Sequence, residues 1–540
     1  MAARKVYCRR FVRYFSFLLL LLFFAAFSSA AERYVYPQQQ LEGGLRLNFA
    51  GAGIQYPNIQ AAIDDACNGD IIYLAPGRFS GSGNRDLDFN GKAITVSSLD
   101  PNDPCVVAAT IIDCNGEEGE YRGFYFHSGE SLNSLLEGVT ITNGKCLYFS
   151  TFGGAIYCIN SSPKISKCLV ERNYAGYGAI ALLDSNAVIS NCIIRKNYTE
   201  GCGSGAAGIF IMSNHSNILV EHSAIVENTA KDRYPGGLGV NVRYPWMSEE
   251  DINESNCILV NCLIAGNSPS GVTCDTKSTV WMYSSDVSDN KGFGITIKGL
   301  VYFINSILWN NNSNASGNDV SLEGTSTNIA KIIFEYSTFD PRKIYISWQD
   351  GWRGAYEVGL GCITFNRFID PNFSPCFVRQ TCWNDNGTPD YDRDDYVETL
   401  GDYHLKSEGW RWDADTNQWT WDDVTSRCID AGNPGYSLGD EPITLSVDPL
   451  HRFGVNKRID MGAYGGTAEA SMPPYGWALL SDIDNNGKVN FVDFYYLANY
   501  YLQEGEKLNS DLNRDGAVNL KDLSLIALDW LKFTDWAVGR

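Results

Sequence analysis

The stretch GAIALLDSNAVISNCIIRKN, residues 178–197, decides the fold. Its first phrase, GAIALL, is a small-residue turn followed by apolar residues at alternate positions, and its second phrase, CIIRKN, ends in asparagine. Apolar residues at every second position predict a β-strand with one buried face. We therefore expect two short strands, with Ile180 and Leu182 of the first and Ile194 of the second pointing inward.

The same two phrases recur between about residue 150 and residue 340. The first returns as GGAIYC, AGIFIM, LGVNV, SGVTCD and FGITIK, starting at residues 153, 207, 238, 270 and 293. The second closes on Asn173, Asn197, Asn228, Asn267, Asn290 and Asn311, in steps of 21 to 39 residues. Short strands repeated at such a period are typical of a solenoid. We expect the asparagines to adopt the left-handed backbone conformation at a corner and to hydrogen-bond from coil to coil.

Aligning the phrases predicts two inward rungs in each coil. The first rung is Ile156, Ile180, Ile209, Val240, Val272 and Ile295, and the second is Cys158, Leu182, Ile211, Val242, Cys274 and Ile297. Residues between the rungs, such as Phe210, face outward. Residues 58–70, NIQAAIDDACNGD, have helical spacing and predict a cap for the first coil, ending near Gly69.

These phrases resemble the repeats of right-handed parallel β-helix proteins, a group that includes pectate lyases, other polysaccharide lyases and some glycoside hydrolases. They are also similar to the repeats of polymorphic outer-membrane proteins. The resemblance implies a mainly β fold, a right-handed parallel β-helix with an N-terminal helical cap, over residues 32–340. A region rich in Trp, Asp and Gly, residues 341–470, would close the solenoid, and WRWDADTNQWTW at 410–421 predicts a hairpin within it.

The composition narrows the choice of partners and compartment. The chain of 540 residues has 63 acidic against 42 basic residues, which makes nucleic acid and anionic membrane surfaces unfavourable partners. Residues 1–31 carry basic residues before an apolar run and predict a cleaved signal peptide. We expect a secreted or cell-surface protein with no membrane span after signal removal. Sixteen cysteines leave an odd fifteen after cleavage, and several fall on inward positions, where Cys acts as a small hydrophobe.

Two twelve-residue loops near the C-terminus predict metal binding. DIDNNGKVNFVD, residues 482–493, and DLNRDGAVNLKD, residues 511–522, match at an offset of 29 residues. Both place oxygen-bearing side chains at positions 1, 3, 5, 9 and 12 and Gly at position 6, which is the spacing of a calcium loop. The predicted ligands are Asp482, Asp484, Asn486, Asn490, Asp493, Asp511, Asn513, Asp515, Asn519 and Asp522, with the carbonyls of Lys488 and Ala517.

The loop pair resembles a type I dockerin, the calcium-folded module by which cellulosomal enzymes attach to cohesin modules on a scaffold. Position 12 is Asp rather than Glu, and each loop is followed but not preceded by a helix pattern. The resemblance implies a small α-helical domain at 476–540 after a linker at 471–475, two bound Ca²⁺ ions and a cohesin-type partner. Loop positions 10 and 11 hold Phe491-Val492 and Leu520-Lys521 instead of small hydroxyl residues, which leaves the choice of cohesin open.

One outward column of the solenoid holds candidate catalytic residues. It reads Ile159, Leu183, Met212, Arg243, Asp275 and Lys298, beside an insertion that carries Tyr244 and Trp246. Lyase chemistry on an acidic polymer needs a cation near the carboxylate and a Lys or Arg base, so we name Arg243, Asp275 and Lys298 as catalytic candidates and the two aromatics as substrate-binding candidates. The same ladder could be a structural row of ion pairs. Two hypotheses stay open: a polysaccharide lyase, glycosidase or binding protein, or a non-catalytic surface or adhesion protein anchored by its dockerin.

Overall fold

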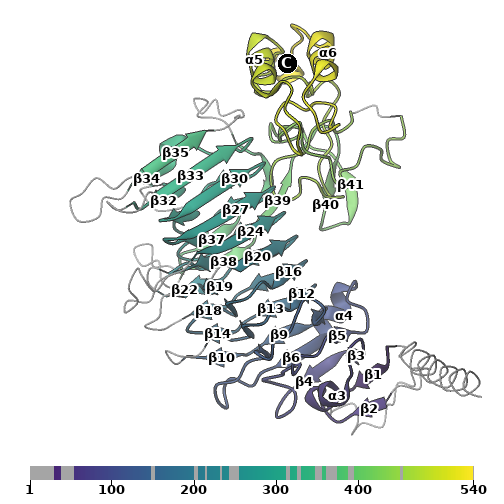
Figure 1. The fold of residues 1–540 in the computed structure, drawn as a ribbon, viewed down its shortest axis with the longest axis vertical. Helices are drawn as coiled ribbons and strands as arrows, with labels where there is room; N and C mark the ends of the chain where they lie inside the picture. Colours follow the sequence, from purple (N-terminus) through teal and green to yellow (C-terminus); the bar gives the residue numbers. More distant parts are fainter. Residues whose placement is uncertain are drawn as a thin grey trace, which may run out of the picture.

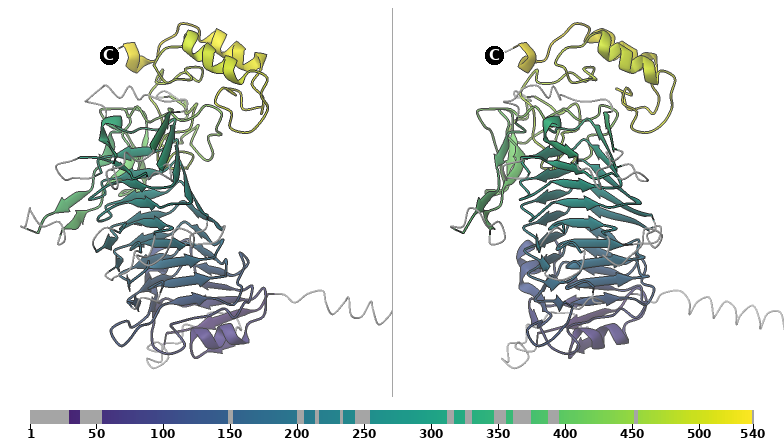
Figure 2. Two further views of the ribbon diagram at one scale, coloured as in Figure 1. Left: turned by 60° about the vertical axis from the view of Figure 1, so that its left-hand side comes forward. Right: turned by 90° about the vertical axis from the view of Figure 1, so that its left-hand side faces the viewer.

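The computed structural model describes residues 30–37, 54–147, 152–199, 205–212, 216–231, 234–242, 254–311, 317–324, 330–346, 356–360, 374–386, 395–450 and 454–538. Within these ranges short parallel strands stack coil upon coil along the long axis of the molecule (Figure 1, Figure 2). Except for its last two residues, the predicted signal peptide lies outside the described residues. No helix in the described part of the chain is both long and apolar enough to span a bilayer.

Three parallel sheets form the walls of a parallel β-helix. Sheet 1 has nine strands from the first phrase and its neighbours: β7 (Phe124–Phe126), β11 (Ile156–Ile159), β15 (Ile180–Leu183), β19 (Ile209–Met212), β23 (Leu238–Val240), β26 (Val272–Cys274), β29 (Ile295–Ile297), β32 (Val320–Leu322) and β34 (Ile344–Ile346). Sheet 3 has nine strands from the second: β4 (Gly77–Phe79), β6 (Thr110–Asp113), β9 (Thr140–Thr142), β13 (Leu169–Glu171), β17 (Ile193–Arg195), β21 (Ala224–Val226), β25 (Leu263–Ala265), β28 (Asp286–Ser288) and β31 (Ile307–Trp309).

Sheet 2 has the most strands of the three, and the two-phrase sequence repeat did not predict a third strand in each coil. Its thirteen strands are β2 (Ile54–Tyr56), β1 (Glu32–Val35), β3 (Ile71–Leu74), β5 (Thr95–Ser98), β8 (Leu135–Glu137), β12 (Lys164–Ser166), β16 (Val188–Ser190), β20 (Ser216–Glu221), β24 (Ser255–Val260), β27 (Ser278–Tyr283), β30 (Leu300–Ile304), β33 (Ala330–Glu335) and β35 (Tyr356–Leu360). A small fourth sheet joins β10 (Lys145–Cys146), β14 (Tyr174–Ala175), β18 (Tyr198–Thr199) and β22 (Thr229–Ala230). A full coil therefore has three main strands rather than two.

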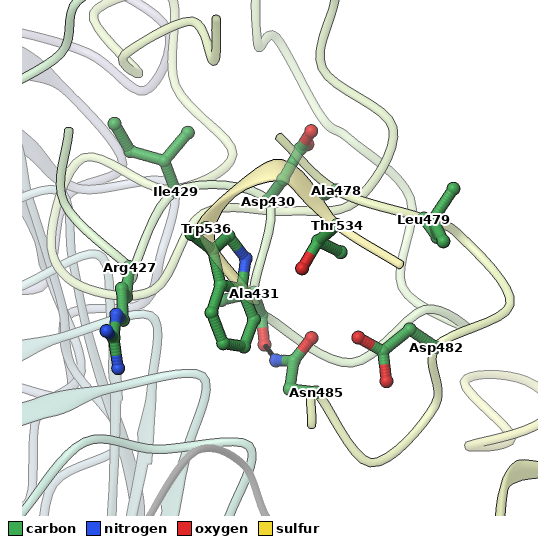
Figure 3. A pocket seen from close by; sticks show the side chains of 10 residues that line it. All are labelled: Arg427, Ile429, Asp430, Ala431, Ala478, Leu479, Asp482, Asn485, Thr534 and Trp536. Atoms are coloured by element: carbon green, nitrogen blue, oxygen red, sulfur yellow. Dashed lines mark hydrogen bonds between the residues drawn. The ribbon is translucent and has the colours of Figure 1, made fainter. Parts of the chain in front are cut away.

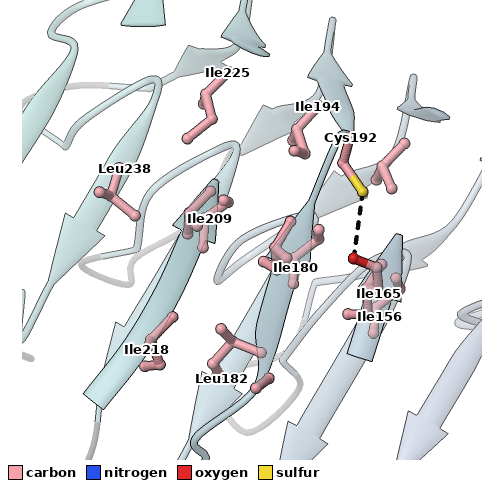
Figure 4. Close-up of a cluster of buried hydrophobic side chains, with 14 of the residues drawn as sticks. Ile156, Ile165, Ile180, Leu182, Cys192, Ile194, Ile209, Ile218, Ile225 and Leu238 are labelled. Atoms are coloured by element: carbon pink, nitrogen blue, oxygen red, sulfur yellow. Dashed lines mark hydrogen bonds between the residues drawn. The ribbon is translucent and has the colours of Figure 1, made fainter. Parts of the chain in front are cut away.

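The interior is filled by inward side chains from all three walls. Ile180 of β15, Ile189 of β16 and Ile194 of β17 are fully buried within one coil, and Ile180 pairs in register with Ile156 and Ile209 of the neighbouring coils (Figure 4). Burial of a side chain of this size contributes about 1.5–3 kcal/mol. The stack of identical rungs is therefore the main source of stability in this region.

One coil departs from the predicted register. Leu238 and Val240 of β23 pair with Ile209 and Ile211, so this coil's rungs are Leu238 and Val240, and the prediction of Val240 and Val242 is wrong by two residues. A shift of two keeps the same face inward, which is why alternation alone cannot detect it. Val242 lies instead in a second apolar cluster, outside the interior of the β-helix.

The second apolar cluster covers part of the outer face of sheet 1. Phe210 points outward, as predicted, yet it is fully buried because it packs with Tyr157, Tyr177, Ala206 and Val242. An outward position on this sheet is therefore not always a solvent-exposed one.

The predicted asparagine ladder is confirmed. From Asn173 to Asn290, each side-chain amide donates to the Oδ1 of the next ladder asparagine at 2.8–3.1 Å, and each backbone N–H donates to the same oxygen. The left-handed conformation, however, falls one residue earlier than expected. It is adopted by Arg172, Lys196, Glu227, Gly266, Asp289 and Asn310.

A second ladder of Cys and Ser lies at the corner between sheets 2 and 3. The backbone N–H of Cys168 donates to Cys192 Sγ at 3.4 Å, and that of Cys192 donates to Ser223 Oγ at 3.1 Å. In later coils Cys262 donates in the same way to Ser285 at 3.2 Å. All cysteines in the described ranges carry free thiols. These cysteines thus replace a serine hydroxyl in the ladder rather than form disulfides.

Different secondary-structure elements precede and follow the coils of the solenoid. At the N-terminal end α3 (Ile59–Asp65) confirms the predicted cap: it starts at Asn58, whose side chain accepts the N–H of Ala61 at 2.8 Å. A second short helix, α4 (Pro104–Ala109), follows. After the last coils come the 3-10 turn η2 (Pro341–Lys343) and three antiparallel pairs, the last of which is the predicted hairpin: β36 (Phe377–Arg379) with β39 (Asp402–Leu405), β37 (Cys382–Asn384) with β38 (Tyr396–Thr399), and β40 (Arg411–Asp413) with β41 (Gln418–Thr420). The pair of β37 and β38 lies along the side of the coils, where the N–H of Thr381 donates to Asp289 Oδ2 at 2.8 Å and the Trp383 indole N–H donates to the carbonyl of Asp289 at 3.0 Å.

The C-terminal helices lie beyond this end. They are α5 (Phe491–Tyr500), α6 (Leu520–Leu528) and α7 (Asp535–Val538), with α5 and α6 at the top of Figure 1. Residues 471–475, which the sequence predicts as a linker, are bonded to the body: Ser471 Oγ donates to the carbonyl of Leu405 at 2.7 Å, and Ser407 Oγ donates to that of Met472 at 2.5 Å. Residues 471–474 of this connection are buried, whereas Tyr475 is exposed.

Candidate functional site

Three carboxylates of the first C-terminal loop converge. Asp482, Asp484 and Asp493, at positions 1, 3 and 12, have oxygens that all lie within 4.8 Å of one another. Backbone donors hold them in place: the N–H of Gly487 donates to Asp482 Oδ2 at 2.8 Å, and that of Asp484 donates to Asp493 Oδ1 at 3.3 Å. The loop therefore aims its acidic side chains at a common centre.

The negative charges of the carboxylates in this loop are only partly balanced by other groups of the chain. Burial, reinforced by the neighbouring carboxylates, raises the pKa of Asp482 to about 7 and that of Asp493 to about 6. Such a shift means that their charged forms are disfavoured when no cation is near. Calcium takes about six to eight oxygen ligands at flexible geometry, and a set of carboxylate and amide oxygens fits that preference.

The second loop repeats the first in its backbone hydrogen bonds. The N–H of Gly516 donates to Asp511 Oδ2 at 2.8 Å, and the N–H of Asn513 donates to Asp522 Oδ1 at 3.1 Å. One contact is new: Lys521 Nζ donates to Asp515 Oδ2 at 2.6 Å. The first loop has apolar Val492 at the position of Lys521, so only the second loop carries a lysine on one of its predicted ligands.

The asparagines at position 9 act as helix caps. Asn490 Oδ1 accepts the N–H of Val492 at 2.9 Å, and Asn519 Oδ1 accepts that of Lys521 at 2.9 Å. Their side-chain amides donate back to the position-7 carbonyls of Lys488 and Ala517, at 3.1 and 3.0 Å. In this arrangement the position-9 side chains start α5 and α6 while the carboxylates at position 12 face the loop.

The sharp turn of each loop depends on left-handed backbone. Gly487 and Gly516, at position 6, have φ of 83° and 84°, where a Cβ atom would be strained. Position 4 is left-handed too, with φ of 52° at Asn485 and 57° at Arg514. The side chains at position 4 point out of the loop and bind other parts of the chain, as described below.

The candidate catalytic column of sheet 1 is partly assembled. Lys298 Nζ lies 3.5 Å from Asp275 Oδ2 and 3.7 Å from Glu323 Oε2 of the next coil. Asp275 is only 2% exposed, whereas the Lys298 side chain is 28% exposed. Glu323 was not among the predicted residues of the column. The sequence does contain the signal for it, because VSLE at 320–323 aligns with ITIK at 295–298 and places Glu323 after Lys298.

The register shift in β23 changes the rest of this column. The position assigned to Arg243 is taken by Asn241, because Val240 pairs with Cys274 and Asn241 therefore precedes Asp275 in the column. Arg243 itself, with Tyr244 and Trp246, lies outside the described residues.

Two family models match the chain. One, described as a right-handed beta helix region, matches residues 102–243. The other, described as a dockerin type I domain, matches residues 480–527 and so contains both acidic loops. No curated protein matches the chain significantly.

Several solved structures are similar to the chain at low identity. Pectate lyase Pel9A is 15% identical with a TM-score of 0.33, covering 81% of this chain and 97% of that one. A rhamnogalacturonan lyase is 13% identical with a TM-score of 0.34, covering 65% and 91%. An alginate lyase from Paenibacillus sp. str. FPU-7 is 10% identical with a TM-score of 0.26, covering 56% and 96%. Likenesses of this degree say nothing about a shared activity.

Proposed function

Because this chain joins a right-handed parallel β-helix to a C-terminal type I dockerin domain, we propose that it is an extracellular, cellulosome-type protein that binds or degrades polysaccharide. The observation that carries the proposal is the duplicated acidic loop, since a dockerin serves to attach its protein to a cohesin module. Dockerins in the resembling family usually accompany modules that act on carbohydrate, which supports that role for the β-helix.

The dockerin part of the proposal includes two calcium ions. The first would be held by Asp482, Asp484, Asn486, Asp493 and the carbonyl of Lys488, with Asn490 at position 9. The second loop offers the equivalent set, namely Asp511, Asn513, Asp515, Ala517, Asn519 and Asp522. When bound, calcium supplies the positive charge that orders each loop. The chain's own contribution is the wrapped backbone, which brings the carboxylates together and starts a helix at position 9.

The partner-binding surface that we propose lies on α5 and α6. Phe491 and Val492 at the start of α5 are 76% and 43% exposed, and Leu520 at the start of α6 is 67% exposed. Exposed apolar residues grouped on two neighbouring helices are typical of a protein-binding surface. A cohesin that accepts this dockerin would present an apolar surface to these positions.

The catalytic part of the proposal concerns the sheet 1 column. Lys298 is the candidate base for proton abstraction from an acidic polymer, with Asp275 beside it, while Arg243, Tyr244 and Trp246 remain candidates for catalysis and substrate binding. A specific contact favours the alternative, a non-catalytic surface or adhesion protein: Lys298 already lies between two carboxylates, as expected of a structural ion-pair ladder.

A screen of the mature protein on acidic and neutral polysaccharides tests both readings. We expect a lyase to produce unsaturated ends that absorb in the ultraviolet and a glycosidase to produce reducing ends only. If Lys298 is the base, Lys298→Ala removes most of the turnover; because it also takes a cation away from buried Asp275, the turnover is compared at a temperature where the variant remains folded. Lys331→Ala, on the outer face of sheet 2, is the matched control. Activity that survives Lys298→Ala moves the site elsewhere, and no cleavage or binding of any polymer supports the adhesion alternative.

A further inference from the structure

Position 4 of each predicted calcium loop is hydrogen-bonded to residues 428–466, a segment that is itself bonded to the coils through Asn305. At position 4 of the first loop, Asn485 Nδ2 donates to the carbonyl of Ala431 at 2.6 Å. At position 4 of the second, Arg514 donates to the carbonyls of Pro434 at 3.0 Å and Lys457 at 2.6 Å. All three acceptors belong to residues 428–466, which we name the end segment. A tether between independent domains would not need two equivalent anchors.

Arg458 of the end segment makes the reciprocal contact. It is fully buried, and its guanidinium donates to the carbonyl of Asp482 at 2.6 Å and to Asn485 Oδ1 at 2.7 Å. The same group holds its own segment through the carbonyl of Gly432, at 2.6 and 2.8 Å. Asp482 is position 1 of the first loop, so one guanidinium joins a predicted calcium ligand's backbone to the end segment.

Apolar and polar packing surrounds these anchors. Cys428 and Met461 of the end segment share one buried cluster with Trp477 and Ile483 of the dockerin. Figure 3 shows the narrow crevice between the two parts, with Asn485 bonded to Ala431 and the Asp482 side chain on the same rim. The crevice is too filled to hold a ligand of its own, and it marks the contact surface instead.

We propose that calcium binding and docking of the dockerin on the end segment are one coupled equilibrium. The inference rests on the calcium binding given under Proposed function and goes beyond it: the dockerin would be a calcium-dependent cap of the β-helix rather than a freely swinging module. Asn485 and Arg514 make these contacts from the left-handed conformation that position 4 adopts in the wrapped loop. Because a coupling free energy acts in both directions, docking must also strengthen calcium binding.

This coupling would fix the orientation of the partner. The anchors occupy the side of the dockerin that faces the coils, while α5 and α6 lie beyond it at the far end of the molecule (Figure 1). A cohesin on these helices would then hold the β-helix at a defined angle. Calcium loss would release both the partner and the body.

Hydrogen exchange of the mature protein, with calcium and with a chelator, tests the coupling. The reporter amides are in the end segment, such as that of Gly432, which donates to Ile459, and that of Met461, which donates to Cys428. We expect chelation to raise exchange at least tenfold in residues 428–466 as well as in 476–538. Faster exchange confined to 476–538 overturns the coupling while leaving calcium binding intact. No change anywhere contradicts calcium binding itself, and with it the proposed function.

Calcium affinity of a variant gives the reciprocal test. Arg458→Met removes the guanidinium and is expected to weaken binding at the first loop about tenfold, since hydrogen bonds from a charged group are among the stronger ones. Arg342→Met removes an exposed arginine that pairs with Asp340, outside both loops and the end segment, and is the control. Unchanged affinity in Arg458→Met overturns the proposal.

A second variant covers the case in which Arg458→Met does not fold. Asn485→Gly keeps the left-handed backbone at position 4, removes the contact with Ala431, and changes no predicted ligand. We expect about threefold weaker calcium binding and faster exchange in the end segment. If both properties match those of the parent, docking and calcium binding are independent.

Discussion

The β-helix and the dockerin are both built from repeats, but the buried polar side chains of the two regions differ in what surrounds them. In the β-helix the amide of Asn197 donates to Asn228 Oδ1 at 2.9 Å and to the carbonyl of Val170 at 3.0 Å. In the first dockerin loop, buried Asp482 and Asp493 face another carboxylate. In the β-helix each asparagine is paired by the next coil, whereas we propose that the carboxylates of the dockerin loops are paired by a cation from outside the chain.

The difference predicts two kinds of stability in one molecule. The β-helix should depend on the rungs and ladders that successive coils share, and hardly at all on calcium. The dockerin should depend on calcium more than on its small apolar core. The following variants and treatments each alter the stability of one of these two regions.

The largest effect is expected from a charge in the β-helix interior. Ile209→Asp places a carboxylate without a partner among fully buried side chains, which we expect to cost more than about 4 kcal/mol and to abolish soluble expression. Ile193→Asp, on β17 of sheet 3 and 44% exposed, is the control and should be mild. Folding yield and thermal melting measure both. Equal behaviour of the two variants would contradict the assigned faces.

Removal of calcium should act on the other region. With a chelator we expect the helical circular dichroism of α5 and α6 to disappear while the β-sheet signal of the solenoid persists, because the proposed calcium ligands lie in the loops that start these two helices. Asp493→Ala with Asp522→Ala should reproduce this loss in the presence of calcium. A helical signal that resists both treatments would show that the two regions are stabilised alike.

A gap in the asparagine ladder should have a smaller effect. Asn228→Ala leaves the backbone N–H and the amide of Asn197 without their acceptor, and an unpaired buried polar group costs about 1–3 kcal/mol. Asn186→Ala removes one exposed hydrogen bond, to the N–H of Asn217, and is the control. Denaturant midpoints compare them. The ladder is dispensable if Asn228→Ala is no less stable than Asn186→Ala.

Sequence periodicity was enough to predict what repeats. The inward rungs, the asparagine ladder and the N-terminal cap follow from residue types at fixed spacing, because burial requires the same chemistry in each coil. Most strands of sheet 2 were missed because only the two recurring phrases were aligned, although Ser255–Val260 and Ser278–Tyr283 of this sheet alternate buried and half-buried positions over six residues. The slip at β23 arose because Leu238, Val240 and Val242 fit the pattern equally well.

The candidate sites also differ in how far they could be predicted from the sequence. The calcium loops could be located because each is a local twelve-residue pattern, and the structure places three of the predicted carboxylates together. The candidate column depends on register across coils, so one slip replaced Asn241 by Arg243. The anchoring of the dockerin by Arg458 could not be predicted, since no pattern links residues of the end segment to a loop that follows by more than twenty residues.

The smallest effect should separate the two calcium loops from each other. Lys521, at position 11 of the second loop, donates to Asp515, one of that loop's predicted ligands, while Val492 holds position 11 of the first. The lysine must give up this contact when calcium binds, so the second loop should have the weaker affinity. Because the pair lies on the surface, its influence is small and screened by salt.

Exchanging the two residues tests this directly. Lys521→Val should raise the calcium affinity of the second loop about threefold, and Val492→Lys should lower that of the first by a similar factor, as expected for an exposed ion pair. Lys532→Val removes an exposed lysine that pairs with Asp529, outside both loops, and is the control. Calorimetric titration at low and high salt measures the two sites. The lysine competes for the ligand only if the difference between Lys521→Val and the parent shrinks as salt rises; a difference that salt leaves unchanged would assign the effect to helix packing instead.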